Sequence, residues 1–401
     1  MQIQLTKTKT IEINLPFGGG GGSGGGKSRR RGPSDVVGVE FGSGDPRGCP
    51  AVRLTRKKGH LHVYAAGFVK PPEGAIPQSW EELSNQATWS LPVDYQAPGA
   101  ALAVSTADMF LRQTTPDALT ANSMSAPKIA LEQPGRKKLG LKSLKSESAP
   151  AVAAGPAGKT PAPPSGVATS SNGTRFVVQP LADESFIVES GMPEYQVLWL
   201  SRLLPEGKRP TAVSVQTYNA ALLSSVLNQP EFVEADGNAL VLFMTRDSVF
   251  FAGYQEGRLL LLRECPGAQG HLFIRETVKK RLGLDEEMVD SVLNESLIDP
   301  TPVLEPFARP ILQQLEISMD YLSRRHALHV DRVFLLGLPS GAQYWSRMSE
   351  DALKVPLVTP SAFAGLEMPA KGNRVPEMDE AKSQVFLGAI GAAVAAMEVG
   401  E

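Results

Sequence analysis

The stretch Asp35-Val36-Val37-Gly38-Val39-Glu40-Phe41 is mostly apolar and runs directly into a glycine-rich turn that begins at Gly42. Two further apolar runs follow after short turns, at 50–55 and 60–67. Short runs with so few polar side chains are typical of strands in a sheet that is covered on both faces. The folded part of the chain is therefore predicted to begin with strand, turn, strand, turn, strand.

The same pattern returns in the second half of the chain. Apolar runs at 239–243, 248–254 and 258–263 are separated by turns at 245–247 and 255–257. Helical periodicity then predicts helices over 271–282, ending at Gly283, and over 303–325, with a strand at 332–336 between the latter and a closing helix over 379–397. Strands followed by helices, twice over, indicate an α/β protein.

Composition excludes several classes of protein. With 42% hydrophobic and 20% charged residues and a net charge of −2, the chain has no overall field that would favour nucleic acid or an anionic membrane. Its two cysteines exclude a disulfide framework, and its five histidines lie scattered without the spacing of a zinc site. The N-terminus has no signal-peptide run, and the apolar stretch 385–397 is shorter than the roughly 20 residues that span a bilayer. We therefore expect a cytoplasmic protein that binds no metal.

Composition also divides the chain. Residues 1–17 alternate as one extended strand, and residues 18–33 form a glycine-rich linker with a basic end. Residues 133–173 combine Pro, Ala, Gly, Ser and Lys with few large apolar side chains, which predicts a disordered insertion. The patterned parts are 34–132 and 174–401.

Several short phrases resemble the PilM family of type IV pilus assembly, which is related to FtsA and belongs to the actin-like ATPase superfamily. Val37-Gly38-Val39-Glu40-Phe41-Gly42-Ser43 is similar to the family's opening I-G-I-D-I-G-S, and 70–76 is similar to its K-P-P-E-G-A-I. The stretch 100–112 resembles a strand pair of the extra subdomain, 203–210 the connection toward the second lobe, and 386–397 the closing helix.

This resemblance implies a duplicated actin-like (ribonuclease H-like) α/β fold of two lobes with a small inserted α/β subdomain. Residues 34–132 would form the first lobe with part of the subdomain. Residues 174–401 would complete the subdomain and add the second lobe and the closing helix of the first.

The resemblance implies a nucleotide site in which several of the family's residues are replaced. Its first turn keeps Gly42, Ser43 and Gly44, but Glu40 stands where the family has Asp. In the second turn Leu242 replaces the family's Asp and Met244 its Gly, with Asp247 the nearest carboxylate. The third element reads Gly337-Leu338-Pro339 in place of a Gly-Gly turn. We expect no ATPase activity and no certain cofactor, while binding of ATP with Mg²⁺ stays an open alternative.

A second phosphate-binding pattern occurs in the linker. Residues 21–28 satisfy G-x-x-x-x-G-K-[ST], but a polyglycine tract meets most of that expression trivially. A P-loop also needs a following helix, and Arg29-Arg30-Arg31-Gly32-Pro33 starts a helix poorly. We interpret this tract as a linker.

The N-terminal strand carries a further resemblance. Ile13-Asn14-Leu15-Pro16 is similar to the I-N-L-L-P tail with which the membrane protein PilN docks in the groove of PilM. The strand could fill the groove of its own chain or of a second copy, because the glycine linker spans on the order of 15–18 Å. The alternative is a plain edge strand or an unfolded end.

Taken together, these features predict a PilM-like cytoplasmic scaffold that is not an enzyme. It would bind the tail of a PilN-like inner-membrane protein, contact the membrane only through that partner, bind no nucleic acid, and self-associate through residues 1–17. The alternatives are an ATP-binding switch that controls assembly and an FtsA-like cell-division adaptor. An FtsA-like protein ends in a basic amphipathic helix, whereas no Lys or Arg follows Lys382.

Overall fold

A computed structural model gives the fold of the chain. It describes residues 33–42, 45–72, 76–77, 79, 81–82, 89–106, 109–115, 166–169, 174–181, 186–203, 211–295, 298–337, 341–369, 375–376 and 380–398. The predicted strand 1–17 with Ile13, Asn14, Leu15 and Pro16, the linker up to residue 32, and the two turn residues Ser43 and Gly44 lie outside these ranges.

The first half of the fold is built on a five-stranded sheet with the order β3-β2-β1-β4-β9. Its strands are β1 (Asp35–Phe41), β2 (Cys49–Lys57), β3 (His60–Val69), β4 (Gly99–Val104) and β9 (Thr211–Thr217). β1, β2 and β3 are antiparallel neighbours, whereas β4 runs parallel to both β1 and β9. The predicted first three strands are confirmed.

The second half repeats this plan. Its sheet has the order β12-β11-β10-β13-β14. The strands are β10 (Ala239–Met244), β11 (Val249–Gln255), β12 (Arg258–Glu264), β13 (Val333–Leu336) and β14 (Leu357–Val358). The pairing directions match those of the first sheet, so the repeated unit predicted from the sequence is confirmed.

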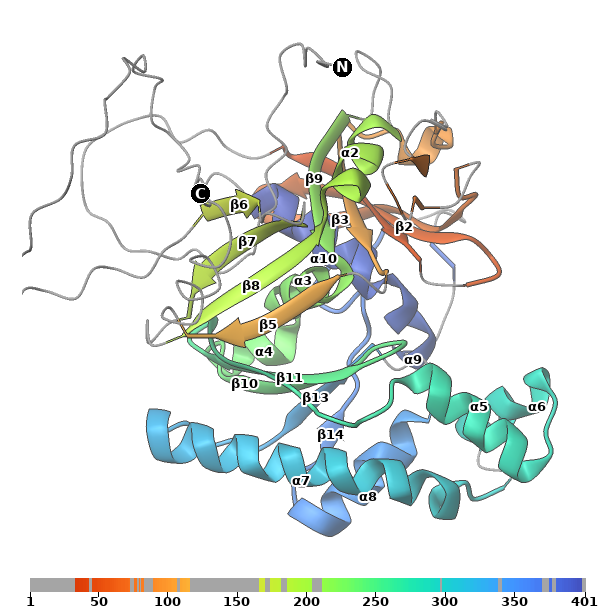
Figure 1. Cartoon of the computed structure of the whole chain (residues 1–401), viewed down its shortest axis with the longest axis vertical. Coiled ribbons are helices and arrows are strands. Elements are labelled where there is room, and N and C mark those ends of the chain that lie inside the picture. The colour runs from red at the N-terminus through yellow and green to blue at the C-terminus, as the bar shows by residue number, and fades with distance from the viewer. Residues whose placement is uncertain are drawn as a thin grey trace, which may run out of the picture.

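A third sheet is formed by the chain between β4 and β9. It has the order β5-β8-β7-β6, from β5 (Phe110–Thr114), β6 (Gly166–Thr169), β7 (Thr174–Pro180) and β8 (Ile187–Pro193). Figure 1 shows it crossing the front of the molecule, with β5 directly above the second sheet.

Two expectations for this region are wrong. The stretch 100–112 is not one strand pair, because β4 belongs to the first sheet and β5 to the third. The small apolar side chains of β4 are all buried, as a strand in the middle of a two-sided sheet requires. Residues 166–169, assigned to the disordered insertion, pair with β7. Backbone hydrogen bonds to a neighbouring strand offset an ordering cost that composition alone cannot predict.

Helices cover the sheets. They are α2 (Glu194–Leu203), α3 (Tyr218–Ser225), α4 (Pro230–Glu234), α5 (His271–Leu282), α6 (Glu286–Glu295), α7 (Thr301–His326), α8 (Ala342–Leu353), α9 (Glu380–Ser383) and α10 (Leu387–Glu398), with 3₁₀ turns η2 (Val93–Tyr95), η3 (Val226–Asn228) and η4 (Gln384–Phe386). The helix predicted over 271–282 is confirmed, with Gly283 in the left-handed conformation after it. Among the described residues no helix is long and apolar enough to cross a membrane.

The predicted closing helix over 379–397 is wrong in its continuity, because it is divided into α9, η4 and α10. Ser383 accepts a hydrogen bond from the amide of Ala362, at 2.8 Å, just where the helix tightens. Gln384, the next residue, donates to the carbonyl of Pro360. These hydrogen bonds to residues 360–362 stabilise a tighter 3₁₀ turn at this point more than a continuous α-helix would be stabilised.

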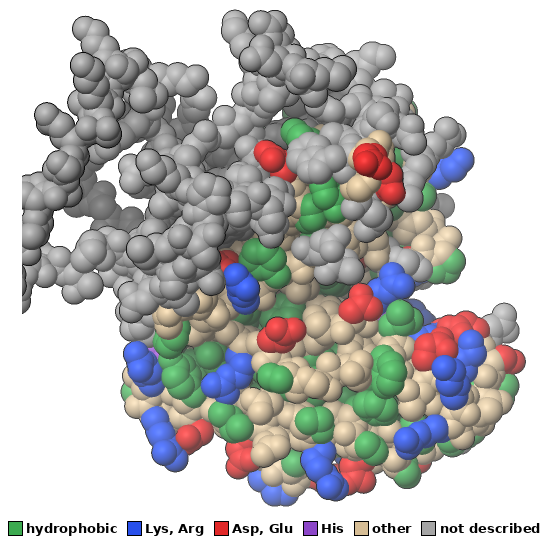
Figure 2. Space-filling model, viewed as in Figure 1, with side chains coloured by type: hydrophobic (Ala, Val, Ile, Leu, Met, Phe, Trp, Pro, Cys, Tyr) green, Lys and Arg blue, Asp and Glu red, His purple; other side chains and the backbone are tan. Residues whose placement is uncertain are grey.

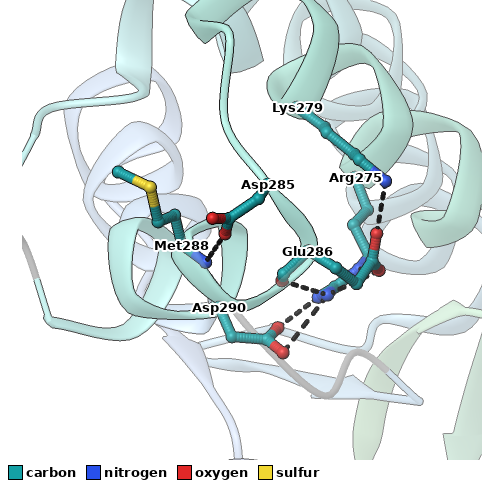
Figure 3. Close-up of polar contacts among 6 residues, drawn as sticks. All are labelled: Arg275, Lys279, Asp285, Glu286, Met288 and Asp290. Carbon is teal, nitrogen blue, oxygen red and sulfur yellow. Dashed lines mark hydrogen bonds and ion pairs between the residues drawn. The ribbon is translucent and has the colours of Figure 1, made fainter.

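The hairpin of α5 and α6 projects from one end of the molecule (Figure 1). Arg275 of α5 bonds to Glu286 and Asp290 of α6, and Lys279 Nζ lies 2.6 Å from the Glu286 carboxylate, as Figure 3 shows. Asp285 caps α6 by accepting the amide of Met288 at 2.8 Å. Figure 2 shows acidic and basic side chains close together on the surface of this end of the molecule.

Candidate functional site

The predicted nucleotide-binding turns follow the ends of β1 and β10, and strand register shows which residues correspond between the two halves. Phe41, the last residue of β1, lies opposite Val104 of β4. Phe243 lies opposite Leu336 in the last pair of β10 with β13. Because both sheets share one strand order, Phe41 corresponds to Phe243.

The neighbouring positions differ sharply between the halves. By this correspondence Leu242 occupies the place of Glu40, and Met244 the place of Gly42. Leu242 and Met244 are fully buried in the apolar core that packs against α5, α7 and α8. The second turn therefore holds neither a carboxylate nor a glycine at the positions where the first turn has both.

Asp247 is the carboxylate nearest to positions 242 and 244 in the second turn. Its side chain is 73% exposed and lies 4.0 Å from Arg246. The turn itself is closed by Thr245, whose amide donates to the carbonyl of Ser248 at 2.9 Å.

Glu40 is buried rather than aimed at solvent. Its side chain points toward α10, where a Cβ added to Gly388 would lie 2.4 Å from Glu40 Oε2. Oε2 has no hydrogen-bond partner among the described residues. Burial, with a smaller contribution from the charge of Asp45, raises the pKa of Glu40 to about 8. Without a bound cation this carboxyl therefore favours its neutral form at neutral pH.

Arg246 joins the two halves across the turns. Its Nη1 donates to the carbonyl oxygen of Gly42 at 3.3 Å, so the side chain of one turn reaches the backbone of the other. Behind it, burial and the charges of Arg275 and Arg246 lower the pKa of His271 to about 4. His271 is therefore neutral at physiological pH and leaves Arg246 as the cation at the junction.

Gly337, from the third predicted element of the nucleotide site, also has its backbone amide hydrogen-bonded within the chain. Its amide donates to Gln384 Oε1 at 3.0 Å, and both residues are buried. Of the predicted nucleotide-site residues that the structure describes, Glu40 points into the core, Gly42 accepts from Arg246, and Gly337 bonds to Gln384. The structure brings these three turns together, and the chain's own side chains already bond to the backbone of the first and the third.

A cleft of about 450 Å³ lies beside the junction, and none of its lining residues was predicted from the sequence as a peptide-binding residue. It is lined by the ends of β4 and β9, by β5, by the start of α3, by the turn after β10 and by the end of β12. Its lining mixes apolar and polar side chains, including Met109, Phe110, Phe250, Asn219, Asp247 and Glu264.

The walls of the cleft come from segments far apart in the sequence. Thr217 caps α3 by accepting the amide of Ala220 at 3.3 Å, and its hydroxyl lies 2.8 Å from that of Ser190 on β8. This pair ties the third sheet to the first beside the cleft. In the sequence, the one signal that could have indicated this cleft is the presence of polar residues at the ends of strands, because ligands in α/β folds bind at such ends.

Comparison with known proteins supports the fold. A solved PilM-PilN type IV pilus biogenesis complex contains a chain that superposes with a TM-score of 0.51 at 12% sequence identity, covering 90% of this chain and 97% of that one. The chain has an actin-like fold.

Another match is a Bacteroides thetaiotaomicron protein with an actin-like ATPase fold and unknown function, at a TM-score of 0.35 and 9% identity, covering 81% of this chain and 91% of that chain. No protein-family model and no curated protein matches the sequence. The superposition on the chain of the PilM-PilN complex, at 12% identity, shows the fold alone and leaves function to be argued from the site.

Proposed function

We propose that this chain is a PilM-like cytoplasmic scaffold of a type IV pilus-like assembly platform, and that it is not an ATPase. The observation that carries the proposal is the state of the three turns: a buried neutral acid at Glu40, leucine at 242, and backbone groups already bonded by Arg246 and Gln384. A nucleotide would have to displace these contacts and would find leucine in place of a carboxylate at position 242.

The partner would be a PilN-like inner-membrane protein, bound through a short extended tail in the 450 Å³ cleft. A cleft of mixed apolar and polar lining, bordered by strands, suits an extended peptide whose alternate side chains enter pockets. Membrane association would then be indirect. We further propose that residues 1–17, with Ile13, Asn14, Leu15 and Pro16, compete for this cleft in the same chain or in a second copy.

Filling the cleft tests its role. Asn219 lies in the first turn of α3, is partly buried and lines the cleft. Replacing it with tryptophan should weaken binding of a fluorescent tail peptide containing I-N-L-L-P at least tenfold, or about 1.4 kcal/mol, because the indole occupies the peptide's space. Fluorescence anisotropy measures the affinity.

The control places the same indole elsewhere. Gln313 on α7 lines a separate groove of about 540 Å³ between α7 and α8. Gln313→Trp should leave peptide affinity unchanged, and thermal melts verify that both variants are folded. Equal affinities for the wild type and Asn219→Trp would contradict binding in this cleft.

A further inference from the structure

Arg112 on β5 is held in place by a buried carboxylate. It lies directly opposite Glu189 of β8 in the third sheet, and its Nε and Nη2 each lie 2.7 Å from Glu189 Oε2. The side chain of Glu189 is only 3% exposed, whereas that of Arg112 is 55% exposed and lines the cleft. The buried acid therefore positions an exposed base at the wall of the cleft.

A second contact fixes the plane of the Arg112 guanidinium. Its Cζ lies 4.9 Å from the centroid of the Phe110 ring, and both residues stand on one face of β5 and line the cleft. Nη1 takes no part in the ion pair with Glu189. Because the planar fork is already held, little side-chain entropy is lost when Nη1 forms one more hydrogen bond. Arg112 thus offers a ligand a charged N–H donor in a fixed geometry.

Several other polar side chains of the cleft already have partners within the chain. The hydroxyls of Thr106, Thr217 and Thr245 each lie within 3.1 Å of a hydrogen-bonding partner. Hydrogen bonds that involve a charged group are stronger than those between neutral groups. Arg112 is therefore the donor through which this lining best distinguishes a ligand that carries an acceptor from one that does not.

The charges beside the cleft favour an uncharged acceptor. Arg112 is already balanced by Glu189. In the turn after β10, Arg246 and Asp247 lie 4.0 Å apart, so this cation also has an acid beside it. The remaining charged residue of the lining is Glu264, whose exposed carboxylate repels an anion. A side-chain amide supplies a carbonyl oxygen without adding a negative charge.

We propose that Arg112, positioned by Glu189, selects the tail that binds in the cleft by donating from Nη1 to the side-chain carbonyl oxygen of an asparagine. The inference rests on the proposed function, since it names the residue that determines which tail the cleft accepts. A tail without the amide would cover Nη1, remove its water and leave it unpaired, and such a loss is what makes a polar site reject an apolar analogue.

The candidate tails have the composition that this selection requires. The I-N-L-L-P tail and residues 13–16 of this chain each carry one asparagine among apolar side chains. The lining supplies apolar side chains for the rest of such a tail, among them Met109, Phe250 and Leu262. The asparagine is then the one side chain of the motif that needs a polar partner.

Two tail peptides test the selection. One contains I-N-L-L-P, and in the other leucine replaces the asparagine, which keeps a similar shape and removes the polar atoms. Anisotropy titrations use the full-length chain carrying Ile11→Ser, Ile13→Ser and Leu15→Ser, so that its own segment does not compete. The asparagine peptide should bind about tenfold more tightly than the leucine peptide, or better.

Substitutions at the ion pair should remove this preference. Arg112→Lys keeps a cation beside Glu189 but loses the planar fork. It should weaken binding of the asparagine peptide about tenfold and change the affinity of the leucine peptide by less than about twofold. Glu189→Gln releases the guanidinium and should reduce the same preference. Thermal melts verify that each variant is folded.

The matched control is Arg53→Lys. Arg53 also bonds through Nε and Nη2 to an acid, Asp35, and its Cζ lies 4.3 Å from the centroid of the Tyr64 ring. This arrangement repeats that of Arg112 outside the cleft lining. Arg53→Lys should therefore preserve the preference for the asparagine peptide.

The outcomes distinguish this inference from the proposed function. Equal affinities of the two peptides overturn selection by Arg112 and leave the cleft as a peptide site, and this comparison needs no substitution at the ion pair. A preference that persists in Arg112→Lys, or that Arg53→Lys also abolishes, overturns the role of Arg112 as well. Failure of both peptides to bind at about a millimolar overturns the peptide site itself, and with it this inference.

Discussion

Gly38→Ala is expected to lower the free energy of unfolding by about 3 kcal/mol or more, because β1 and α10 touch through bare backbone at this position. A Cβ added to Gly38 would lie 1.8 Å from the carbonyl oxygen of Ala389 and 3.1 Å from the Cβ of Ala393. Neither the central strand nor the helix can move by more than an ångström without disturbing the core on both sides.

The control for this substitution is Gly267→Ala. Gly267 has a positive φ of 76°, and nothing lies within 4 Å of an added Cβ. Its replacement should cost only about 1 kcal/mol, from backbone strain alone. Chemical denaturation measures both variants, and similar losses for the two would contradict the close packing of α10 on β1.

Glu40→Gln is expected to change the pH dependence of stability. The carboxyl of Glu40 has a pKa of about 8 in the folded chain against 4.5 for an ordinary glutamate, because burial penalises its charged form. Between these pH values the folded chain holds a proton that the unfolded chain has released, so the contribution of Glu40 to stability falls as pH rises. The loss is complete above the folded-state pKa and is on the order of 3–5 kcal/mol.

Glutamine cannot ionise, so the variant should lose much less stability than the wild type between pH 6.5 and 8.5. This window also avoids the opposite contribution of His271, whose folded-state pKa of about 4 makes stability rise with pH only below its ordinary value of 6.5. Denaturation curves at each pH measure the effect, with Glu350→Gln, an exposed acid, as the control. Parallel pH profiles for Glu40→Gln and the wild type would contradict a buried, protonated Glu40.

The repeated strand unit could be predicted because its information is local. Apolar runs, turn residues and the glycine after α5 each act within a few residues of the structure they determine. The resemblance to the PilM family placed Leu242 and Glu40 at the same position of the two turns, and the strand registers support this correspondence.

The remaining features depend on contacts that spacing does not encode. Gln384 interrupts the closing helix because it reaches Gly337, which is distant in sequence. The burial of Glu40 depends on Tyr218 and Gly388, from two other helices. The cleft is lined by both β5 and β12, which are joined by Gln113, a residue whose sequence neighbourhood shows no binding motif.

The most direct measurement of the central claim is isothermal calorimetry with two ligands, a tail peptide containing I-N-L-L-P and ATP with Mg²⁺. The protein is the full-length chain carrying Ile11→Ser, Ile13→Ser and Leu15→Ser, so that its own N-terminal segment does not compete for the cleft. A scaffold whose first and third turns are already bonded and whose cleft is open should bind the peptide with saturable heat and give no heat with nucleotide at concentrations up to about a millimolar. Micromolar binding of ATP with Mg²⁺, or no binding of the peptide, would contradict the account.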